Sequence, residues 1–482
     1  MAILTIDQGT TGTTVLLIDN DGEILAKAYQ EFEQIYPQAG WVEHDPLEIW
    51  HTVETCVDEI MEEHDETIAA VGITNQRETT LIWDAITGKP VYNAIVWQCR
   101  RTSEICKTLE PLRETIKEKT GLPLDAYFSG TKAQWILEQA EIPPDADLKF
   151  GTIDTWLVWK LTGGKVHATD YTNASRTMIY NIHAKYWDRE LCQLMKIPEA
   201  LLPEVKRSAD DYGIVSSLEQ LRNVPIYSVI GDQQASLYGQ QCFLPGEIKN
   251  TYGTGCFIVM NTGAEAVHSQ KGLITTLAVA PDGSPCYALE GAIFIAGAAI
   301  QWLRDELGLI KSAAESEAAA SSETDNGGVY FVPAFVGLGA PHWDMEARGI
   351  ITGLTRGSNR NHLIRAGLES MAYQTYDVIQ SMIDETGLEI TTLAVDGGAT
   401  ENDFLMQFQA DILDLPIDRA RRIETTALGA AYLAGLRIGI WKSEDLKAFA
   451  REKQRFKPGM PAAQRKQNLS GWESAIRKVL QA

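Results

Sequence analysis

The 482-residue sequence has no long uncharged stretch of the kind that crosses a membrane as a helix. Its longest run without Asp, Glu, Lys or Arg covers residues 326–343, and Pro333, Pro341 and several glycines interrupt it. Such breaks are typical of strands and loops in a folded core, so we expect no membrane insertion. No basic region precedes the first apolar residues and Asp7 follows them closely, so we also expect no signal peptide.

Positive charge is scarce. The chain holds 42 Lys and Arg against 65 Asp and Glu, which gives a formal net charge of −23 at pH 7. A surface this acidic repels phosphodiester backbones and anionic lipids. We therefore expect no nucleic-acid partner and no binding to a membrane surface.

Cysteine is sparse and unpatterned. The chain has seven cysteines with no C-x-x-C, and its eight histidines show no H-x-x-x-H spacing. An odd number of cysteines in a large chain favours reduced thiols and a cytoplasmic protein, and this spacing does not indicate a zinc site.

Three common motifs of nucleotide binding and catalysis are missing. The chain has no G-x-x-x-x-G-K-[ST], no G-x-G-x-x-G in a usable context and no G-x-S-x-G. The P-loop, Rossmann and α/β-hydrolase classes therefore lose support.

The sequence does contain a repeated pattern. A strand, a turn rich in glycine and threonine, and a second strand are predicted at residues 3–18 and again at 250–260, about half the chain apart. A helix follows in each half, predicted at 45–63 with Asp45 as its N-cap and at about 292–307. With roughly 150 residues per domain as a guide, this pattern predicts two domains of similar plan with a cleft between them.

The end of the chain differs in charge from the rest. Residues 451–482 hold eight Lys or Arg and two Asp or Glu. This composition fits a solvated tail or a final helix attracted to the acidic body, and docking to a partner is a further alternative.

The two glycine-threonine turns are candidate phosphate sites. Glycines allow close approach of an anion, and hydroxyls and turn N–H groups can bind its oxygens. Asp7, at the end of a predicted strand, could hold a metal through water. Either turn alone is also typical of a structural hairpin. Two turns at equivalent places in two half-chains favour a clamp on a triphosphate.

Three further junctions carry polar groups that could act chemically. Asp396-Gly397-Gly398 lies between a predicted strand and helix, which suits either a nucleotide or a tight turn. Asp232 follows the predicted strand 226–230 and opens a helix, as a reactive carboxylate or as an N-cap. Arg77-Glu78 follows another strand, and adjacent opposite charges are more typical of a surface.

Longer strings in the same order resemble the glycerol kinases of the sugar and polyol kinase family, nearly from end to end. The strings that carry the resemblance are 7–11, 74–79, 97–102, 127–132, 154–157, 170–177, 231–234, 250–257, 301–305, 337–341, 396–399 and 426–431. The resemblance implies an α/β fold of two RNase-H-like domains, of the actin and hexokinase type, flanking a deep interdomain cleft. We expect a polyol-binding domain at 1–242, a nucleotide-binding domain at 243–450 and a basic tail at 451–482.

The resemblance also implies a substrate site. Asp232 matches the family's general base for the terminal hydroxyl, and Trp97 and Phe257 match aromatic walls on the carbon face of the polyol. The full set that the resemblance assigns to the polyol is Arg77, Glu78, Trp97, Tyr127, Asp232, Gln233 and Phe257. A triol recognised by convergent polar groups would exclude analogues that lack a hydroxyl.

ATP and Mg²⁺ are the cofactors that the resemblance implies. Asp7 matches the region of the Mg²⁺ shell, with the metal held through water. The positions assigned to the nucleotide are Thr10, Thr11, Gly12, Thr14, Thr254, Gly297, Gln301, Gly398 and Asn402. Most members of the family have an arginine at the position of Thr14, and many have a serine at that of Gly12. Losing a guanidinium removes a charged phosphate contact.

The activity implied is ATP:glycerol 3-phosphotransferase, which converts glycerol to sn-glycerol 3-phosphate. One alternative is a kinase for another small polyol or ketose such as dihydroxyacetone. The substitution at Thr14 motivates a second alternative, a catalytically weak nucleotide-binding scaffold. The expected partners are glycerol and ATP, and assembly into a homo-oligomer is left open.

Overall fold

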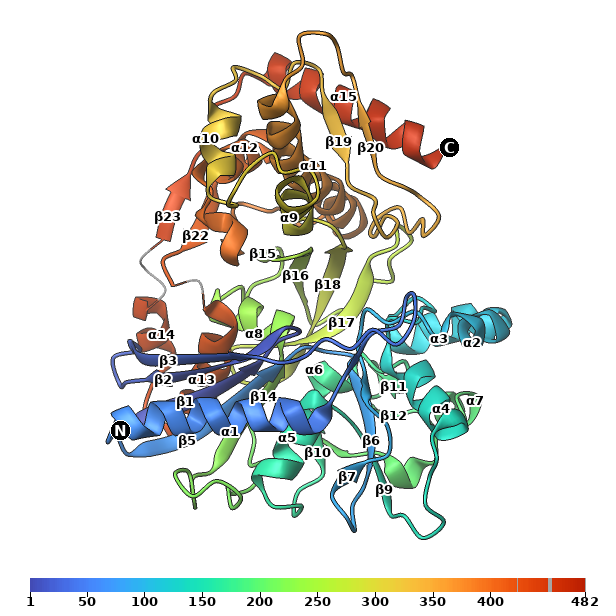
Figure 1. Cartoon of the computed structure of the whole chain (residues 1–482). Helices are drawn as coiled ribbons and strands as arrows, with labels where there is room; N and C mark the ends of the chain where they lie inside the picture. The colour runs from blue at the N-terminus through green and yellow to red at the C-terminus, as the bar shows by residue number, and fades with distance from the viewer. Residues whose placement is uncertain (423, 450–452, 482) are drawn as a thin grey trace.

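The computed structural model describes residues 1–422, 424–449 and 453–481. The chain forms two lobes, with the first half of the sequence in the lower lobe of Figure 1 and most of the second half in the upper lobe. Each lobe is built on a mixed sheet flanked by helices, which confirms the predicted α/β architecture. Within the described ranges, no helix is long and apolar enough to cross a bilayer.

The lower lobe is organised around a five-stranded sheet in the order β14-β5-β1-β2-β3. These strands are β1 (Ala2–Gln8), β2 (Gly12–Ile18), β3 (Ile24–Glu31), β5 (Ile68–Asn75) and β14 (Ile226–Gly231). The first three are antiparallel, and β5 and β14 lie parallel to β1. As predicted, Asp45 caps the helix α1 (Pro46–Glu63), which packs its buried residues on β2 and β3.

A second part of the lower lobe carries smaller elements. Its strands are β4 (Glu43–His44), β6 (Thr80–Asp84), β7 (Lys89–Pro90), β8 (Ala94–Ile95), β9 (Leu148–Thr152), β10 (Ala168–Asp170), β11 (Tyr180–Asn181), β12 (Tyr186–Trp187) and β13 (Glu204–Lys206). Its helices are α2 (Ser103–Leu109), α3 (Arg113–Thr120), α4 (Ser129–Gln139), α5 (Ile153–Leu161), α6 (Tyr171–Ala174), α7 (Arg189–Leu194) and, after β14, α8 (Asp232–Gly239).

The upper lobe repeats the plan of the lower one. Its sheet has the order β17-β18-β16-β15-β21-β22-β23, and the segment β18-β16-β15 is antiparallel while β21 and β22 lie parallel to β15. The strands are β15 (Ile248–Tyr252), β16 (Cys256–Gly263), β17 (Ile274–Val279), β18 (Pro285–Ile293), β21 (Leu393–Asp396), β22 (Ile417–Ala420) and β23 (Lys453–Phe456), with the separate pair β19 (Tyr330–Val332) and β20 (Ile350–Thr352).

Seven helices follow from the second half of the described chain: α9 (Gly297–Asp305), α10 (Glu315–Ser321), α11 (Arg360–Thr386), α12 (Asp403–Leu413), α13 (Thr425–Ile438), α14 (Ser443–Phe449) and α15 (Ala462–Leu480). The helix predicted at 292–307 is shorter than expected at both ends. Ala292 and Ile293 continue β18 because they pair with β16, and α9 begins only at Gly297.

Helix α13 belongs to the second half of the sequence but packs against the lower lobe, on β1, β5, β14 and α8 (Figure 1). A Cβ at Gly239 of α8 would lie 2.2 Å from the Thr425 carbonyl oxygen, and one at Gly429 of α13 would lie 2.0 Å from that of Ala235. Both glycines are therefore needed for the close crossing of the two helices. This crossing fixes the helix that begins with Asp232.

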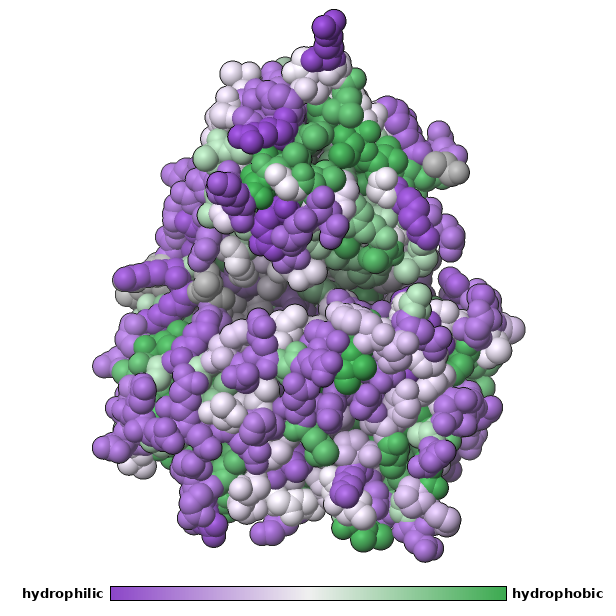
Figure 2. Space-filling model, viewed as in Figure 1, coloured by the Kyte–Doolittle hydropathy of each residue, from purple (hydrophilic) through white to green (hydrophobic). Residues whose placement is uncertain are grey.

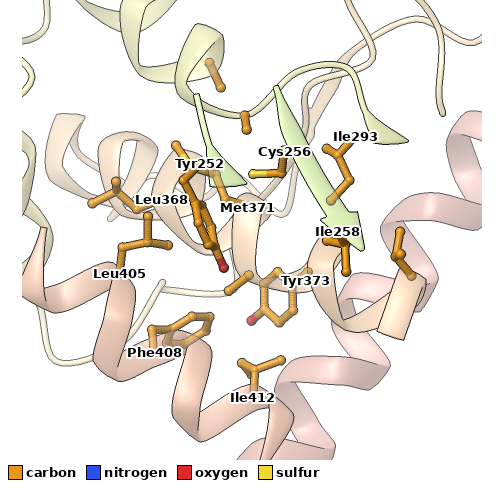
Figure 3. Packing of buried hydrophobic residues seen from close by; sticks show 14 of the residues in the cluster. Tyr252, Cys256, Ile258, Ile293, Leu368, Met371, Tyr373, Leu405, Phe408 and Ile412 are labelled. Carbon is orange, nitrogen blue, oxygen red and sulfur yellow. The ribbon is translucent and has the colours of Figure 1, made fainter. Parts of the chain in front are cut away.

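The core of the upper lobe supports the second glycine-threonine turn. Figure 3 shows Tyr252 and Cys256, at the ends of β15 and β16, packed among side chains of α11 and α12. The Tyr252 hydroxyl also donates a 2.6 Å hydrogen bond to Gln409 Oε1. The turn between these strands is therefore anchored at both ends in close-packed apolar residues.

The basic C-terminal segment is structured where it is described. Lys453–Phe456 forms β23, which pairs antiparallel with β22, and Ala462–Leu480 forms α15 with Trp472 and Ile476 buried. The final helix, rather than a solvated tail, is the form that the structure shows. Residues 451, 452 and 482 of this segment lie outside the described residues.

Candidate active site

Asp232 lies where β14 ends and α8 begins, and its carboxylate is 26% exposed. Its Oδ1 accepts a hydrogen bond from the Gln233 backbone N–H at 2.7 Å and lies 3.1 Å from Arg77 Nε. Its Oδ2 accepts from Gln233 Nε2 at 3.2 Å. Two of the predicted polyol residues thus contact the predicted base directly, and the carboxylate remains open to a substrate.

The interpretation of Arg77-Glu78 as a surface pair is wrong. Both side chains are at most 2% exposed, in a buried ion-pair network with Arg176 and Glu290. Arg77 binds Glu290 through two nitrogens, at 2.6 and 3.0 Å. Arg176 bridges Glu78 at 2.5 Å and Glu290 at 2.9 Å.

The network joins the lobes. Arg77, Glu78 and Arg176 come from the lower lobe, and Glu290 lies on β18 of the upper sheet. Neither Arg176 nor Glu290 is in the predicted site. Arg176 lies within one of the strings that carry the resemblance, and this could have indicated a role in the site. Glu290 could have been noticed only as a lone acid in an otherwise apolar strand.

The pKa values of the two buried acids, Glu290 and Glu78, are shifted in opposite directions. Burial alone would raise the pKa of Glu290, but Arg176 and Arg77 outweigh it and lower the pKa to about 2. Burial raises the pKa of Glu78 above its ordinary value, and Arg176 and Arg77 oppose that rise. Glu78 also has a φ of +61°, a strained conformation for a residue with a side chain. Strain of this kind is typical of functional sites.

Three predicted aromatic residues meet beside these charges. The ring centroid of Trp97 lies 5.7 Å from that of Tyr127 and 6.0 Å from that of Phe257, both edge to face. The Trp97 indole N–H donates a 2.9 Å hydrogen bond to Thr10 Oγ1. The rings therefore form an apolar wall and connect the residues predicted to bind the polyol to the first glycine-threonine turn.

A cavity of about 540 Å³ lies in the upper lobe. It is lined by five of the residues assigned to the nucleotide, namely Thr254, Gly297, Gln301, Gly398 and Asn402. A Cβ at Gly398 would meet nothing within 4 Å, so this glycine faces open space. A cavity of this size is suited to a nucleoside.

The turn between β15 and β16 is docked on the start of α9. The N–H groups of Ala296 and Ala298 donate to the Thr254 carbonyl oxygen at 2.8 and 3.1 Å, and that of Gly297 donates to Gly253 at 3.1 Å. A Cβ at Gly297 would lie 2.6 Å from the Gly253 oxygen. Close contact of the two backbones therefore requires glycine at 297.

The other four nucleotide positions, Thr10, Thr11, Gly12 and Thr14, lie on the β1–β2 hairpin of the lower lobe. A Cβ at Gly12 would lie 2.6 Å from the ring of Tyr29, so the glycine makes room for that side chain. Thr14 pairs with Asp7 on one side and with Tyr29 on the other.

Asp7 fits a cation held mostly by other ligands. Burial, together with the charges of Asp232 and Glu424, raises the pKa of Asp7 to about 8, and Lys27 only partly offsets this. A divalent cation would relieve the excess of acid. In the part of the chain that the structure describes, no cluster of three or more metal-ligating side chains occurs, so such an ion would need water or phosphate oxygens.

The repeated mixed sheets, the cavity in one lobe and the carboxylate among polar and aromatic groups in the other define a two-lobed phosphotransferase. Residues 2–239 match the N-terminal domain, and residues 248–438 the C-terminal domain, of the FGGY family of carbohydrate kinases. The chain belongs to that family.

Individual relatives carry more specific names. The chain is 56% identical to a glycerol kinase of Carboxydothermus hydrogenoformans and 54% identical to glycerol kinase 2 of Thermotoga maritima, covering 99% of this chain and 98% of each relative. The Plasmodium falciparum glycerol kinase solved with ADP matches with a TM-score of 0.91 and 38% identity over 99% of this chain and 98% of that one. A xylulose kinase from Lactobacillus acidophilus, at 23% identity and a TM-score of 0.88 over 100% and 98% of the two chains, shares the fold.

Proposed function

We propose that this chain is an ATP-dependent glycerol kinase that forms sn-glycerol 3-phosphate and ADP. The observation that carries the proposal is the end-to-end match to proteins named glycerol kinase, in a chain where Asp232 contacts Arg77 beside Glu78. The ADP bound in the similar Plasmodium falciparum glycerol kinase supports the choice of nucleotide. As the seven cysteines are all free, we place the enzyme in the cytoplasm.

The polyol site works by positioning a hydroxyl. Arg77, Glu78 and Tyr127 would bind the glycerol hydroxyls, and Trp97 and Phe257 would cover its carbon face. The terminal hydroxyl oxygen attacks the γ-phosphorus and forms the new O–P bond, its proton passes to Asp232, and the bond to the β-phosphate oxygen breaks to release ADP. The transition state is loose, so orientation of the hydroxyl contributes along with proton removal.

The nucleotide would span the two lobes. We assign its adenosine part to the 540 Å³ cavity and its phosphates to Thr254 and to Thr10 and Thr11 of the opposite hairpin. Asp7 would hold Mg²⁺ through water, and that ion supplies charge neutralisation to the phosphate oxygens.

We further propose residues 1–242 as the polyol-binding domain and 243–450 as the nucleotide-binding domain. Figure 2 shows a furrow between the two lobes, where both substrates would have to enter. Closure of the lobes would exclude water and limit wasteful hydrolysis of ATP.

The experiment is a coupled assay of ADP release with Mg²⁺, using glycerol, dihydroxyacetone and a pentulose in parallel. We expect the highest kcat/KM with glycerol, and a clear preference for a pentulose would reject the proposal. Thr14→Arg should be assayed beside the wild type. Absence of turnover in the wild type at millimolar substrate, restored by Thr14→Arg, would favour the scaffold alternative.

A further inference from the structure

Lys249 is a fully buried lysine that the mechanism above does not use. It lies on β15 of the upper lobe with 0% exposure. Its ammonium group donates to Gln233 Oε1 at 2.5 Å, to Thr251 Oγ1 at 2.7 Å and to the Phe257 carbonyl oxygen at 3.3 Å. These acceptors account for all three of its N–H donors.

The first of these contacts determines the orientation of Gln233. A lysine has no acceptor, so the Gln233 side chain must turn its carbonyl oxygen toward Lys249. This leaves the amide nitrogen of Gln233 on the opposite side, where it donates to Asp232 Oδ2 at 3.2 Å. An amide turned the other way would place an oxygen against the carboxylate.

The hydrogen bond to Oδ2 matters because the two oxygens of Asp232 differ. Oδ1 already receives the Gln233 backbone N–H and lies beside Arg77 Nε. The remaining capacity to accept a proton from a substrate hydroxyl therefore lies mainly on Oδ2. The Gln233 amide is the contact that fixes where this oxygen points.

We propose that Lys249 is a positioning residue for Asp232, which acts by holding the Gln233 amide in the orientation that donates to Oδ2. The inference rests on the proposed function, since it assigns Lys249 a part in the same reaction. The contact joins the two lobes, because Lys249 belongs to the upper sheet and Gln233 to helix α8 of the lower lobe.

The charges around Lys249 agree with this role. Burial lowers the pKa of Lys249 to about 8, while Asp396 of β21, Asp232 of α8 and Glu290 of β18 favour its charged form and Arg77 opposes it. At neutral pH most of the population carries the ammonium, with its three donors and no acceptor.

The test is a double-mutant cycle on Lys249 and Gln233. Lys249→Met keeps the length of the side chain and removes its donors, and Gln233→Leu removes the amide. We expect each single variant to lower kcat by about tenfold or more, the scale of a misplaced catalytic group, and to leave the KM for ATP within about twofold. The double variant should be no worse than the more impaired single variant, because both changes break the same connection.

Two controls separate positioning from a loss of fold. Thr251→Val removes a different acceptor of the same ammonium and should change kcat by less than about threefold, since the contact to Gln233 is kept. Gln233→Glu keeps an acceptor for Lys249 but loses the donor to Asp232, so it should fold, with an unchanged Tm, and still lose kcat.

Several results would overturn the inference. Wild-type kcat in Lys249→Met or in Gln233→Glu would do so, and so would a double variant whose loss is the product of the two single losses. If Lys249→Met fails to fold, Lys249→Gln takes its place with the same expectation, because an amide can both donate and accept and so no longer forces the Gln233 oxygen toward position 249. The proposed function fails separately, when the wild-type protein itself does not phosphorylate glycerol.

Discussion

At the scale of single residues, the proposed polyol site is marked by charged side chains that are buried away from water. Arg77 and Arg176 alternate with Glu78 and Glu290, and all four side chains are at most 2% exposed. Buried ions cost several kcal/mol each unless they are paired and hydrogen-bonded. The network is thus weak support for stability by itself, but it holds Arg77 rigidly beside Asp232.

Replacement of Asp232 tests its role as base. Asp232→Asn should lower kcat by ~10² or more, the scale for general acid–base groups. Glycerol should still bind, because Arg77, Glu78 and the aromatic rings remain. Calorimetric titration with glycerol and steady-state kinetics measure the two effects, and near-wild-type turnover would refute the role.

Glu290→Gln tests the network. The neutral amide cannot balance Arg77 and Arg176, and breaking a buried ion pair from one side typically costs about 3–5 kcal/mol. We expect a lower Tm and a raised KM for glycerol, measured by thermal unfolding and the coupled assay. Glu62→Gln, at an exposed position on α1, is the matched control and should change neither quantity. A variant with wild-type Tm and KM would contradict the prediction.

His44 gives the protein a dependence of stability on pH. It is buried, bonded to Gln34 Oε1 at 2.9 Å, and burial lowers its pKa to about 3. The unfolded chain binds a proton near pH 6.5 and the folded one does not, so this contribution to stability is present above pH 6.5 and is lost as the pH falls toward 3.

Protonation of His44 in the unfolded chain should lower the free energy of unfolding by about 2 kcal/mol at pH 5 relative to pH 7. His44→Asn should remove that part of the pH dependence, as measured from urea unfolding midpoints at the two pH values. Burial also lowers the pKa of His167, to about 4. His167 therefore adds the same pH dependence to the free energy of unfolding in the wild type and in His44→Asn. Equal pH dependence in wild type and variant would show that His44 does not titrate in this way.

At the scale of elements, the proposed nucleotide site depends on how the turn between two strands packs against the helix that follows. The turn between β15 and β16 receives hydrogen bonds from the first residues of α9, and its strands are anchored in the apolar core of Figure 3. Small backbone shifts at α9 would therefore move Thr254 directly.

Gly297→Ala tests whether the position of this turn controls the binding of ATP. A Cβ there would lie 2.6 Å from the Gly253 oxygen, so the turn must move away from α9. We expect the KM for ATP to rise by about tenfold, the result of losing well-placed phosphate contacts, with little change in the KM for glycerol. Gly357→Ala, whose Cβ meets only Thr355 at 3.7 Å, is the control. Equal effects on both substrates would point to general destabilisation instead.

Many of the helices and strands can be predicted from the sequence. The strand–turn–strand units, the Asp45 cap and the repeated plan follow from periodicity and turn chemistry, and the structure confirms them. The start of α9 differs from its predicted place because Ala292 and Ile293 suit a helix and a buried strand equally, and only pairing with β16 decides.

The burial of Arg77-Glu78 could not be predicted in the same way. A charged side chain is typical of a surface unless its partners are known, and the partners of this pair, Arg176 and Glu290, are distant in the sequence. Local spacing indicates a site here only together with the resemblance to a family.

Lys249 illustrates a further limit. Nothing in the string around it distinguishes an exposed lysine from a buried one, since its partner Gln233 comes from the other lobe. The predicted polyol and nucleotide sets come from the resemblance. Local spacing alone also allows a structural hairpin at the glycine-threonine turns, an N-cap at Asp232 and a tight turn at Asp396-Gly397-Gly398.

At the scale of the whole molecule, the two lobes are not independent bodies. Helix α13 from the second half packs on the lower sheet, and Glu290 and Lys249 from the upper sheet bind Arg77, Arg176 and Gln233 of the lower lobe. Any opening of the furrow must pivot around these contacts rather than separate them, because a buried charge without its partner is costly.

The position of Glu290 also constrains how such genes can recombine. A chimera that joins residues 1–242 of this chain to the second half of a kinase with a neutral residue at that place in β18 would enclose two guanidinium groups with no counter-ion from across the junction. A chimera made to change substrate specificity would therefore have to keep the glutamate of β18 together with the two arginines of the first half.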